Sequence, residues 1–275
     1  MKKVIALAAI VAASPVYAQV ADGSWTGFYA GGRVGYSFQP SDGDERLAFD
    51  NNLDGNFNDT VRTAAGADAF SPGFCGGRAL GATPGAGCAS DEDSLEWALH
   101  AGFDYDLGGP VIGVVAEAGI GYAEDHVTGF STTPASYTLT RRMKENASLR
   151  ARAGYAFGAE RNTLVYGTGG VVWAKMANEH YSSNVANSFT LREDDSAWGY
   201  RVGGGVEQRV APNLSFGLQY LFTSLKDTGT RVSVTRGTAP ATNPFLLVNA
   251  NGTDFRRTHS RFATHNVSLT ANFRF

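Results

Sequence analysis

The sequence predicts an all-β fold: an eight-stranded antiparallel up-and-down transmembrane β-barrel with long extracellular loops. Three observations predict it. Residues 19–275 contain no run of eighteen apolar residues that could cross a bilayer as a helix. Segments of alternating apolar and polar residues recur along the chain, and short turns alternate with long connections between them. A closed barrel is the other structure that spans a bilayer, because its backbone N–H and C=O groups pair between strands.

Residues 1–18 are predicted to be a secretory signal peptide, and residues 19–275 to form the barrel domain. Two lysines give a basic start, the apolar stretch at 4–13 is too short to span a bilayer, and a small-residue cleavage site follows at 16–18. The net charge of −3 for the whole sequence becomes slightly more negative without these lysines. Such a modest negative charge argues against a nucleic-acid partner.

The segment 94–107 shows the alternation most clearly. Apolar or small side chains fall on one face, and polar or charged side chains fall mainly on the other. A soluble β-sandwich would also bury an apolar face. Trp97 near one end and Tyr105 near the other match the aromatic girdles at the two membrane interfaces of a barrel. The arrangement therefore favours a strand that faces lipid.

Seven further segments of strand-like sequence complete a set of eight. A central Gly-Thr-Gly-Gly sequence leaves the facing of the fifth strand unassigned. The predicted barrel strands lie at residues 28–38, 94–107, 112–122, 149–157, 163–175, 198–206, 214–222 and 267–275.

The connections between the strands alternate in length. Those after the second, fourth and sixth strands are short and contain Gly, Pro or Asn. Short periplasmic turns and long outer loops are expected of a membrane barrel. Strand-like stretches at 231–235 and 245–248 are interpreted as extensions of the seventh and eighth strands above the membrane. If they are separate strands instead, the barrel has ten strands, and this alternative stays open. The long connections lie at 39–93, 124–146, 176–194 and 226–260.

The last strand alternates apolar with polar residues, and the sequence stops on Phe275, two residues after Phe273. A terminal amphipathic strand that ends in Phe resembles the signal read by the outer-membrane assembly machinery. From the opening WTGFYAG at 25–31 to this terminus, the chain resembles the small outer-membrane β-barrel proteins of the OmpA-like and opacity-type porin-like families. The resemblance implies an integral protein of the Gram-negative outer membrane, in contact with outer-membrane lipids and lipopolysaccharide.

Charged side chains are predicted on the inward faces of the strands. Glu117 should lie level with Arg150 and Arg152 on the next strand. These charges would either line a pore or form an ion-pair network that fills the lumen. The network is favoured, because eight strands enclose little more than their own side chains and an unpaired buried charge is costly. Its predicted members are Glu117, Arg150, Arg152, Arg201, Glu207 and His100.

The first long connection contains a sequence similar to the first half of a calcium-binding loop. Oxygen-bearing side chains at alternate positions, with Gly at the sixth, suit a hard cation. The twelfth position is not Glu, so a polar surface loop without calcium is the alternative. No other cofactor is expected. The candidate calcium ligands are Asp50, Asn52, Asp54, Asn56 and Asp59, the last in place of the missing carboxylate.

Cys75 and Cys88 are the only two cysteines, and both lie in this first connection. An even cysteine count in an exported chain predicts a structural disulfide. A zinc site would need further Cys or His nearby in the sequence, and that stretch has none.

The long connections differ in charge. The segment 39–93 carries ten acids and three arginines, whereas 228–260 carries four arginines and one aspartate. Closure of the barrel makes these two segments neighbours. They would attract each other, or the basic segment would bind lipopolysaccharide phosphates, which arginine recognises well. Ordinary solvated loops are the remaining alternative.

The pattern as a whole favours a structural envelope protein whose loops interact with host or environmental surface ligands. A narrow porin for small solutes is the alternative. An enzyme is not expected, since the sequence shows no catalytic constellation. The nearest resemblance to the His–Ser pair of a barrel lipid deacylase is His265 with Ser268, and their spacing puts them on opposite faces of a strand.

Overall fold

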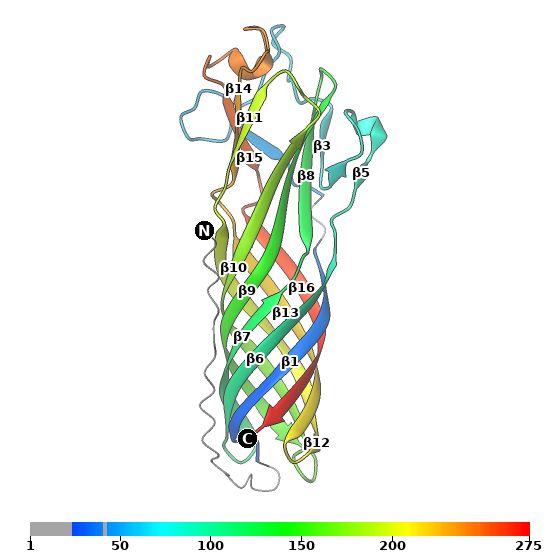
Figure 1. The fold of residues 1–275 in the computed structure, drawn as a ribbon, viewed down its shortest axis with the longest axis vertical. Helices are drawn as coiled ribbons and strands as arrows, with labels where there is room; N and C mark the ends of the chain where they lie inside the picture. Colours follow the sequence, from blue (N-terminus) through cyan, green and yellow to red (C-terminus); the bar gives the residue numbers. More distant parts are fainter. Residues whose placement is uncertain (1–23, 41–42) are drawn as a thin grey trace, which may run out of the picture.

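The structure is a computed structural model that describes residues 24–40 and 43–275. The predicted signal peptide lies outside the described residues. A long barrel forms the lower part of the molecule in Figure 1, and a second folded region lies above it. None of the helices in the described part of the chain is long and apolar enough to cross a membrane. We call the upper region the head; it is made of residues 43–93, 124–142, 176–195 and 227–260.

Eight antiparallel strands close into the barrel. The strands are β1 (Gly27–Phe38), β6 (Ser94–Asp106), β7 (Pro110–Ile120), β9 (Ala135–Phe157), β10 (Thr163–Ser182), β12 (Ser196–Ala211), β13 (Leu214–Lys226) and β16 (Arg261–Arg274). Each pairs with the next around the ring, and β16 pairs with β1 to close it. The predicted eight-stranded up-and-down barrel is therefore confirmed.

The barrel wall has an apolar outer face and a polar inner face. Leu99 and Leu269 point outward and are 65% and 64% exposed, whereas Asn266 points inward and is 2% exposed. Trp97 and Tyr105 stand exposed toward opposite ends of β6. This polarity is inverted relative to a water-soluble protein and suits a wall that faces lipid.

The turn between β6 and β7 depends on its two glycines. Gly108 has a φ of +89°, and the N–H groups of Gly108 and Gly109 both donate to Asp106 Oδ1, at 2.9 and 3.2 Å. A side chain on Gly109 would collide with the ring of Tyr155. Glycine is needed here because only it combines this conformation with such a close approach.

The longest barrel strands are about twice as long as a membrane crossing needs. β9 has 23 residues and β10 has 20, whereas about ten residues cross a bilayer as a tilted strand. The strand β8 (Glu124–Ser131) pairs with the upper half of β9, and β3 (Gly73–Cys75) adds to β8. Most of the connection predicted at 124–146 is therefore strand. The prediction of a loop was wrong because these residues pack within the head and not against lipid, so their sequence lacks the alternation of apolar and polar residues that marks a lipid-facing strand.

A separate four-stranded sheet lies in the head, in the order β11 (Ser188–Arg192), β14 (Arg231–Thr235), β15 (Thr253–Arg257) and β2 (Leu47–Asp50). The stretch 231–235 is thus a strand of this sheet and not an extension of the seventh barrel strand. The stretch 245–248 is not a strand at all, since it begins inside the 3-10 turn η2 (Pro244–Leu246). Both interpretations from the sequence were wrong, and the barrel has eight strands.

The head has its own aromatic core. The ring of Phe70 lies 4.4 Å from that of Phe49 and 5.3 Å from that of Tyr137, centroid to centroid. Phe245 and Phe255 pack against the same group, and all five side chains are at most 5% exposed. Burial of this many aromatic rings is enough to order long connections. The segments predicted as loops therefore form a compact unit.

Candidate functional site: the lumen network and the head

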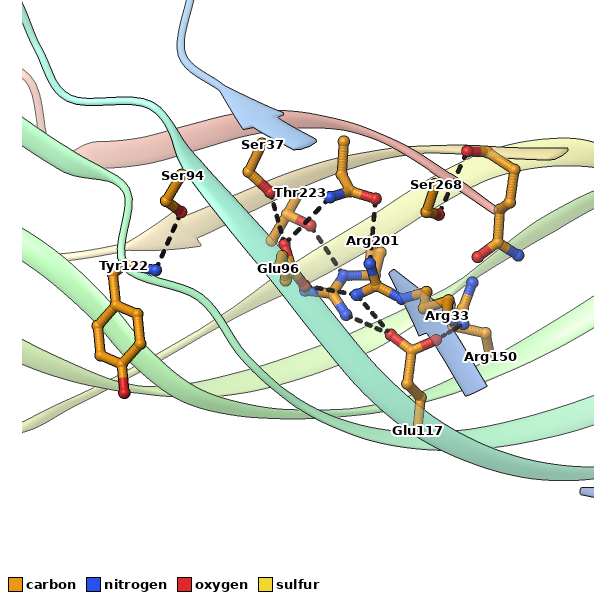
Figure 2. Close-up of polar contacts among 12 residues, drawn as sticks. Arg33, Ser37, Ser94, Glu96, Glu117, Tyr122, Arg150, Arg201, Thr223 and Ser268 are labelled. Carbon is orange, nitrogen blue, oxygen red and sulfur yellow. Dashed lines mark hydrogen bonds and ion pairs between the residues drawn. The ribbon is translucent and has the colours of Figure 1, made fainter. Parts of the chain in front are cut away.

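Glu117 on β7 lies at the centre of the lumen. Its Oε2 accepts a hydrogen bond from Arg150 at 2.7 Å, and its Oε1 accepts from Arg33 at 3.0 Å and Arg201 at 2.9 Å. These side chains come from β7, β9, β1 and β12, and they converge in the barrel interior (Figure 2). None is more than 5% exposed. One carboxylate therefore joins four strands.

A second carboxylate completes this layer. Glu96 on β6 pairs with Arg33, accepts a hydrogen bond from Ser37 at 2.6 Å and lies 3.8 Å from Arg201 (Figure 2). Three guanidinium groups thus face two carboxylates, and charge-assisted hydrogen bonds hold them together. We call this layer the central tier; it consists of Arg33, Glu96, Glu117, Arg150 and Arg201.

A periplasmic tier closes the end of the lumen near the short turns. Arg152 pairs with Glu207 at 2.5 Å, and Arg274 pairs with Asp104 at 2.8 Å. Trp25, which precedes β1 and is fully buried, lies under the guanidinium of Arg274, whose carbon is 5.3 Å from the ring centroid. The described segment before β1 therefore helps to seal this end.

An outer tier lies where the barrel meets the head. Asp125 accepts from Arg141 at 2.6 Å and pairs with Arg257 at 2.9 Å, and Arg257 lies 3.4 Å from Glu45. Burial alone would raise the pKa of Asp125, but Arg257 and Arg141 hold it below its usual value. This tier joins β8, β9 and β15 to the first connection.

A small polar cavity of about 20 Å³ adjoins the central tier. His100, Glu117 and Arg150 are among its lining residues. It has room for roughly one water molecule. A solute larger than water could not enter it without displacing side chains of the central tier.

Five of the six predicted network residues take part in ion pairs, although not in one layer. Glu117, Arg150 and Arg201 belong to the central tier, and Arg152 with Glu207 to the periplasmic tier. The expectation that Arg152 lies level with Glu117 was wrong, because the register places Arg152 opposite Gly113, four residues away. His100, the sixth, forms a hydrogen bond with Asn272 at 2.5 Å rather than an ion pair.

The sequence reasoning missed other members for two different reasons. Arg33 and Arg274 alternate with lipid-facing residues on β1 and β16, so side-chain parity could have found them. The head supplies Glu45, Asp125 and Arg257. No local sequence pattern predicts that the head packs over the end of the barrel. Only the tertiary structure brings these three together.

The disulfide between Cys75 and Cys88 is present, with their Cα atoms 6.7 Å apart. It links β3 to β5 (Cys88–Ala89), which pairs with β4 (Arg78–Ala79) on the other side of the 3-10 turn η1 (Pro84–Ala86). The side chain of Thr128 on β8 donates to the Gly77 carbonyl at 2.8 Å. The disulfide-bonded segment is thereby attached to the extended β8–β9 hairpin.

The residues proposed for calcium form hydrogen bonds within their own loop. The Asp50 carboxylate accepts from the N–H groups of Asp54 and Gly55, at 3.1 and 2.8 Å, and Asp59 accepts from Asn51 N–H at 2.9 Å. Asn52 and Asp54 accept similar backbone bonds. These contacts explain the loop's shape without an ion, and calcium binding at Asp50, Asn52, Asp54, Asn56 and Asp59 stays a prediction.

The acidic first connection and the basic last one do meet. β2 pairs with β15, and Arg257 lies 3.4 Å from Glu45. Arg231 is 3.3 Å from Asp254 within the head sheet. Arg256 lies over the ring of Phe57, 4.2 Å from its centroid, so three of the four arginines counted in the basic segment are engaged within the head. Of the alternatives for these charges, the geometry favours mutual attraction.

His265 and Ser268 lie on opposite faces of β16. His265 faces outward and shares a 2.7 Å hydrogen bond with Tyr220, whereas Ser268 is buried in the lumen. Phe273 and Phe275, the predicted assembly signal, are both exposed on the outer face, with ring centroids 5.2 Å apart. Recognition of these rings by the assembly machinery stays an expectation.

Comparisons with known proteins agree with this architecture. Residues 4–275 match the family model described as "Outer membrane protein beta-barrel domain". The chain is 27% identical over 215 residues to the 31 kDa outer-membrane immunogenic protein of Brucella melitensis, covering 77% of this chain and 76% of that protein. It is 26% identical over 201 residues to the 22 kDa outer membrane protein of Rhizobium leguminosarum, covering 73% and 64%. The solved structure of the outer membrane protein OprG from Pseudomonas aeruginosa is similar in fold, with a TM-score of 0.51, 14% identity, and coverage of 91% and 97%.

Proposed function

The chain belongs to the outer membrane protein beta-barrel domain family and is an integral protein of the Gram-negative outer membrane, and from this premise we propose a structural role with surface recognition. The barrel is a closed anchor, and the head that it carries contacts molecules outside the cell. We propose no catalytic role for either part. The relatives found by comparison are themselves named as outer-membrane proteins.

The central tier is the observation that carries the proposal. Arg33, Glu96, Glu117 and Arg201 project from strands around the ring and bond across the lumen. A solute could pass only by breaking several charge-assisted hydrogen bonds in a medium where unpaired charges are costly. The periplasmic and outer tiers add two more layers of the same kind. This supports a plugged barrel over an open porin.

The folded head supports the recognition role. Its aromatic core and its own sheet fix the positions of surface side chains, and a preorganised surface loses less entropy when it binds. The Brucella melitensis relative is named as immunogenic. We propose that host or environmental ligands contact the head, and that outer-membrane lipids and lipopolysaccharide surround the barrel wall.

Single-channel recording in a planar bilayer tests the plugged barrel. Folded protein is expected to give no conductance steps, because three tiers of ion pairs fill the lumen. A Glu117→Ala variant removes the carboxylate that joins three arginines, and we expect it to give small openings. The matched control is Glu145→Ala, which removes an exposed carboxylate 4.0 Å from Lys175 on the outside of the barrel.

Steady openings of the unaltered protein would contradict the plugged barrel and place the narrow porin first. Loss of Glu117 leaves Arg150 buried without a carboxylate and leaves Arg33 and Arg201 with Glu96 alone, and breaking a buried pair costs about 3–5 kcal/mol. A Glu117→Gln variant, which keeps the shape and the hydrogen-bonding oxygen, is therefore recorded alongside. Retained heat-modifiable migration on gels shows that each recorded protein is folded.

A further inference from the structure

Three potential metal ligands meet at the base of the head, outside both the lumen and the predicted calcium loop. Within residues 24–40 and 43–275, Glu92, Glu124 and His126 form a group whose ligand atoms lie within 4.8 Å of one another. Glu124 and His126 are two residues apart on β8, so they share a face of the strand. Glu92 lies near the end of the first connection, two residues before β6.

The backbone fixes this group in place. Glu92 and Glu124 form an isolated antiparallel bridge, with N–H to C=O distances of 3.0 and 2.9 Å in the two directions. The two residues are therefore directly opposite, and their side chains leave the bridge on the same side. The His126 N–H donates to Asp91 Oδ1 at 2.8 Å. Residues that are far apart in sequence are thus held together by main-chain bonds.

The imidazole of His126 is the observation that points to a ligand. The residue is 2% exposed, and its Nδ1 is 2.8 Å from Thr140 Oγ1, which orients the ring. Its Nε2 is buried without a hydrogen-bond partner, and it lies 3.7 Å from Glu124 Oε2. A buried imidazole nitrogen normally has a partner, and metal-bound histidines characteristically bond through their other nitrogen to such an orienting group.

Two cations lie near the group, Arg142 and Arg78, and the second acts on His126 through its charge. Arg142 on β9, directly opposite Glu124 in the register, pairs with Glu124 Oε1. It leaves Glu124 Oε2 directed toward His126. With neutral His126, the three carboxylates of Glu92, Glu124 and the adjacent Asp91 outnumber these two guanidinium groups by one. The remaining negative charge still attracts a divalent cation. Adjacent ligand atoms in a tetrahedral zinc site lie roughly 3.3 Å apart, given bonds of about 2.0 Å. The His126–Glu124 distance is close to this value.

We propose that Glu92, Glu124 and His126 bind a divalent transition-metal ion of the zinc class, with solvent at a fourth position. One imidazole and two carboxylates suit such an ion better than calcium or magnesium, which prefer oxygen ligands alone. Glu92 is exposed, so the ion can enter from solvent. The bound ion would link the end of the disulfide-bearing connection to the extended β8–β9 hairpin. The ion would thereby stabilise the base of the head.

Equilibrium dialysis with Zn²⁺ tests the site on protein purified from outer membranes in detergent. We expect one Zn²⁺ per chain above the background of a Glu92→Gln/His126→Gln double variant. Either single substitution should weaken binding at least about tenfold, and a large excess of Ca²⁺ should not displace the ion. Co²⁺ substitution should give the visible absorption of a low-symmetry site, and this absorption should be absent from His126→Gln.

Two control variants match the ligand variants. His180→Gln removes another largely buried histidine whose Nε2 lacks a hydrogen-bond partner, but aromatic rings rather than carboxylates surround it. Glu145→Gln removes an exposed carboxylate of the same β9 strand. Both should retain the affinity of the unaltered protein.

If His126→Gln fails to fold, the exposed Glu92→Gln variant decides the question alone. Absence of stoichiometric binding, or equal affinity in the ligand and control variants, would overturn the proposal.

Discussion

Buried arginines define this molecule at the scale of single residues. Arg33, Arg150 and Arg201 are each at most 4% exposed, and all three are paired with Glu117. Arginine suits such positions because its planar guanidinium stays charged and donates several hydrogen bonds in fixed directions. The lumen is therefore filled by polar contacts that a soluble protein would replace with an apolar core.

His180 gives the head a dependence on pH. It lies among Phe189, Phe255 and the Thr138 carbonyl, and burial lowers its pKa from 6.5 to about 4. In the unfolded chain the His180 imidazole binds a proton near pH 6.5, whereas in the folded head it does not bind one until about pH 4. The free energy of unfolding of the head should therefore fall as the pH falls through this window.

Hydrogen exchange of head amides at pH 7 and pH 5 measures this effect. The unaltered protein should lose more protection at pH 5 than His180→Gln does, after correction for the intrinsic exchange rate. His259→Gln, which changes a histidine that is 38% exposed in its side chain, is the control. An identical pH response in the unaltered and His180→Gln proteins would show that His180 does not contribute.

At the scale of elements, one strand serves two environments. The lower half of β9 alternates between lipid and lumen, whereas nearly every residue from Ala135 to Met143 is buried or half-buried in the head. The strand pairing continues without interruption because backbone hydrogen bonding does not depend on which surroundings the side chains meet. Extended β-hairpins therefore carry the barrel's rigidity into the head.

The disulfide stabilises the connection that packs on this hairpin. Reduction, or Cys75→Ser with Cys88→Ser, should cost about 3 kcal/mol within that connection on the chain-entropy model. We expect faster cleavage by an added protease between residues 73 and 93 and an unchanged heat-modifiable barrel. Mass spectrometry of the fragments locates the cut. Equal cleavage rates before and after reduction would mean that packing against β8 already orders the segment.

At the scale of the whole molecule, barrel and head have separate cores. The head core includes Phe49, Tyr137 and Phe255, whereas the periplasmic end of the barrel packs around Trp25 and Leu164. A third apolar cluster, which includes Met143, Met176 and Phe262, lies where the two parts meet. Because the head core shares no residue with that cluster, the head should be able to loosen while the barrel stays closed. The eight strands keep their complete ring of hydrogen bonds in either case.

A Phe255→Ala substitution tests this independence. Removing a fully buried ring should destabilise the head by about 3–5 kcal/mol. Hydrogen exchange should accelerate in β2, β14 and β15 and stay slow in β1 and β16. Leu53→Ala, which truncates a side chain that is 38% exposed on the head, serves as the control. Equal acceleration throughout the barrel would show instead that both parts unfold as one unit.

The barrel could be predicted from the sequence alone. Lipid imposes a strict apolar outer face, so period-two alternation located β1 and β6 nearly to the residue and the C-terminal part of β16. The short turns of Gly, Pro and Asn set the order of the strands. The same parity identified Glu117, Arg150 and Arg201 as lumen residues. The disulfide followed from a cysteine count of two in an exported chain.

The architecture of the head and the pairing of the buried charges depend on tertiary contacts that the sequence pattern does not show. In the head, both faces of a strand are covered by protein, so the alternation that lipid enforces is lost. The strand β8 was therefore predicted as a loop, and the strand-like stretch of β14 was assigned to the barrel instead of the head sheet. Arg152 pairs with Glu207 rather than Glu117 because strand register and tilt, which no local pattern records, set the level of each side chain. The Glu92, Glu124 and His126 group likewise exists only because a backbone bridge joins residues thirty-two positions apart.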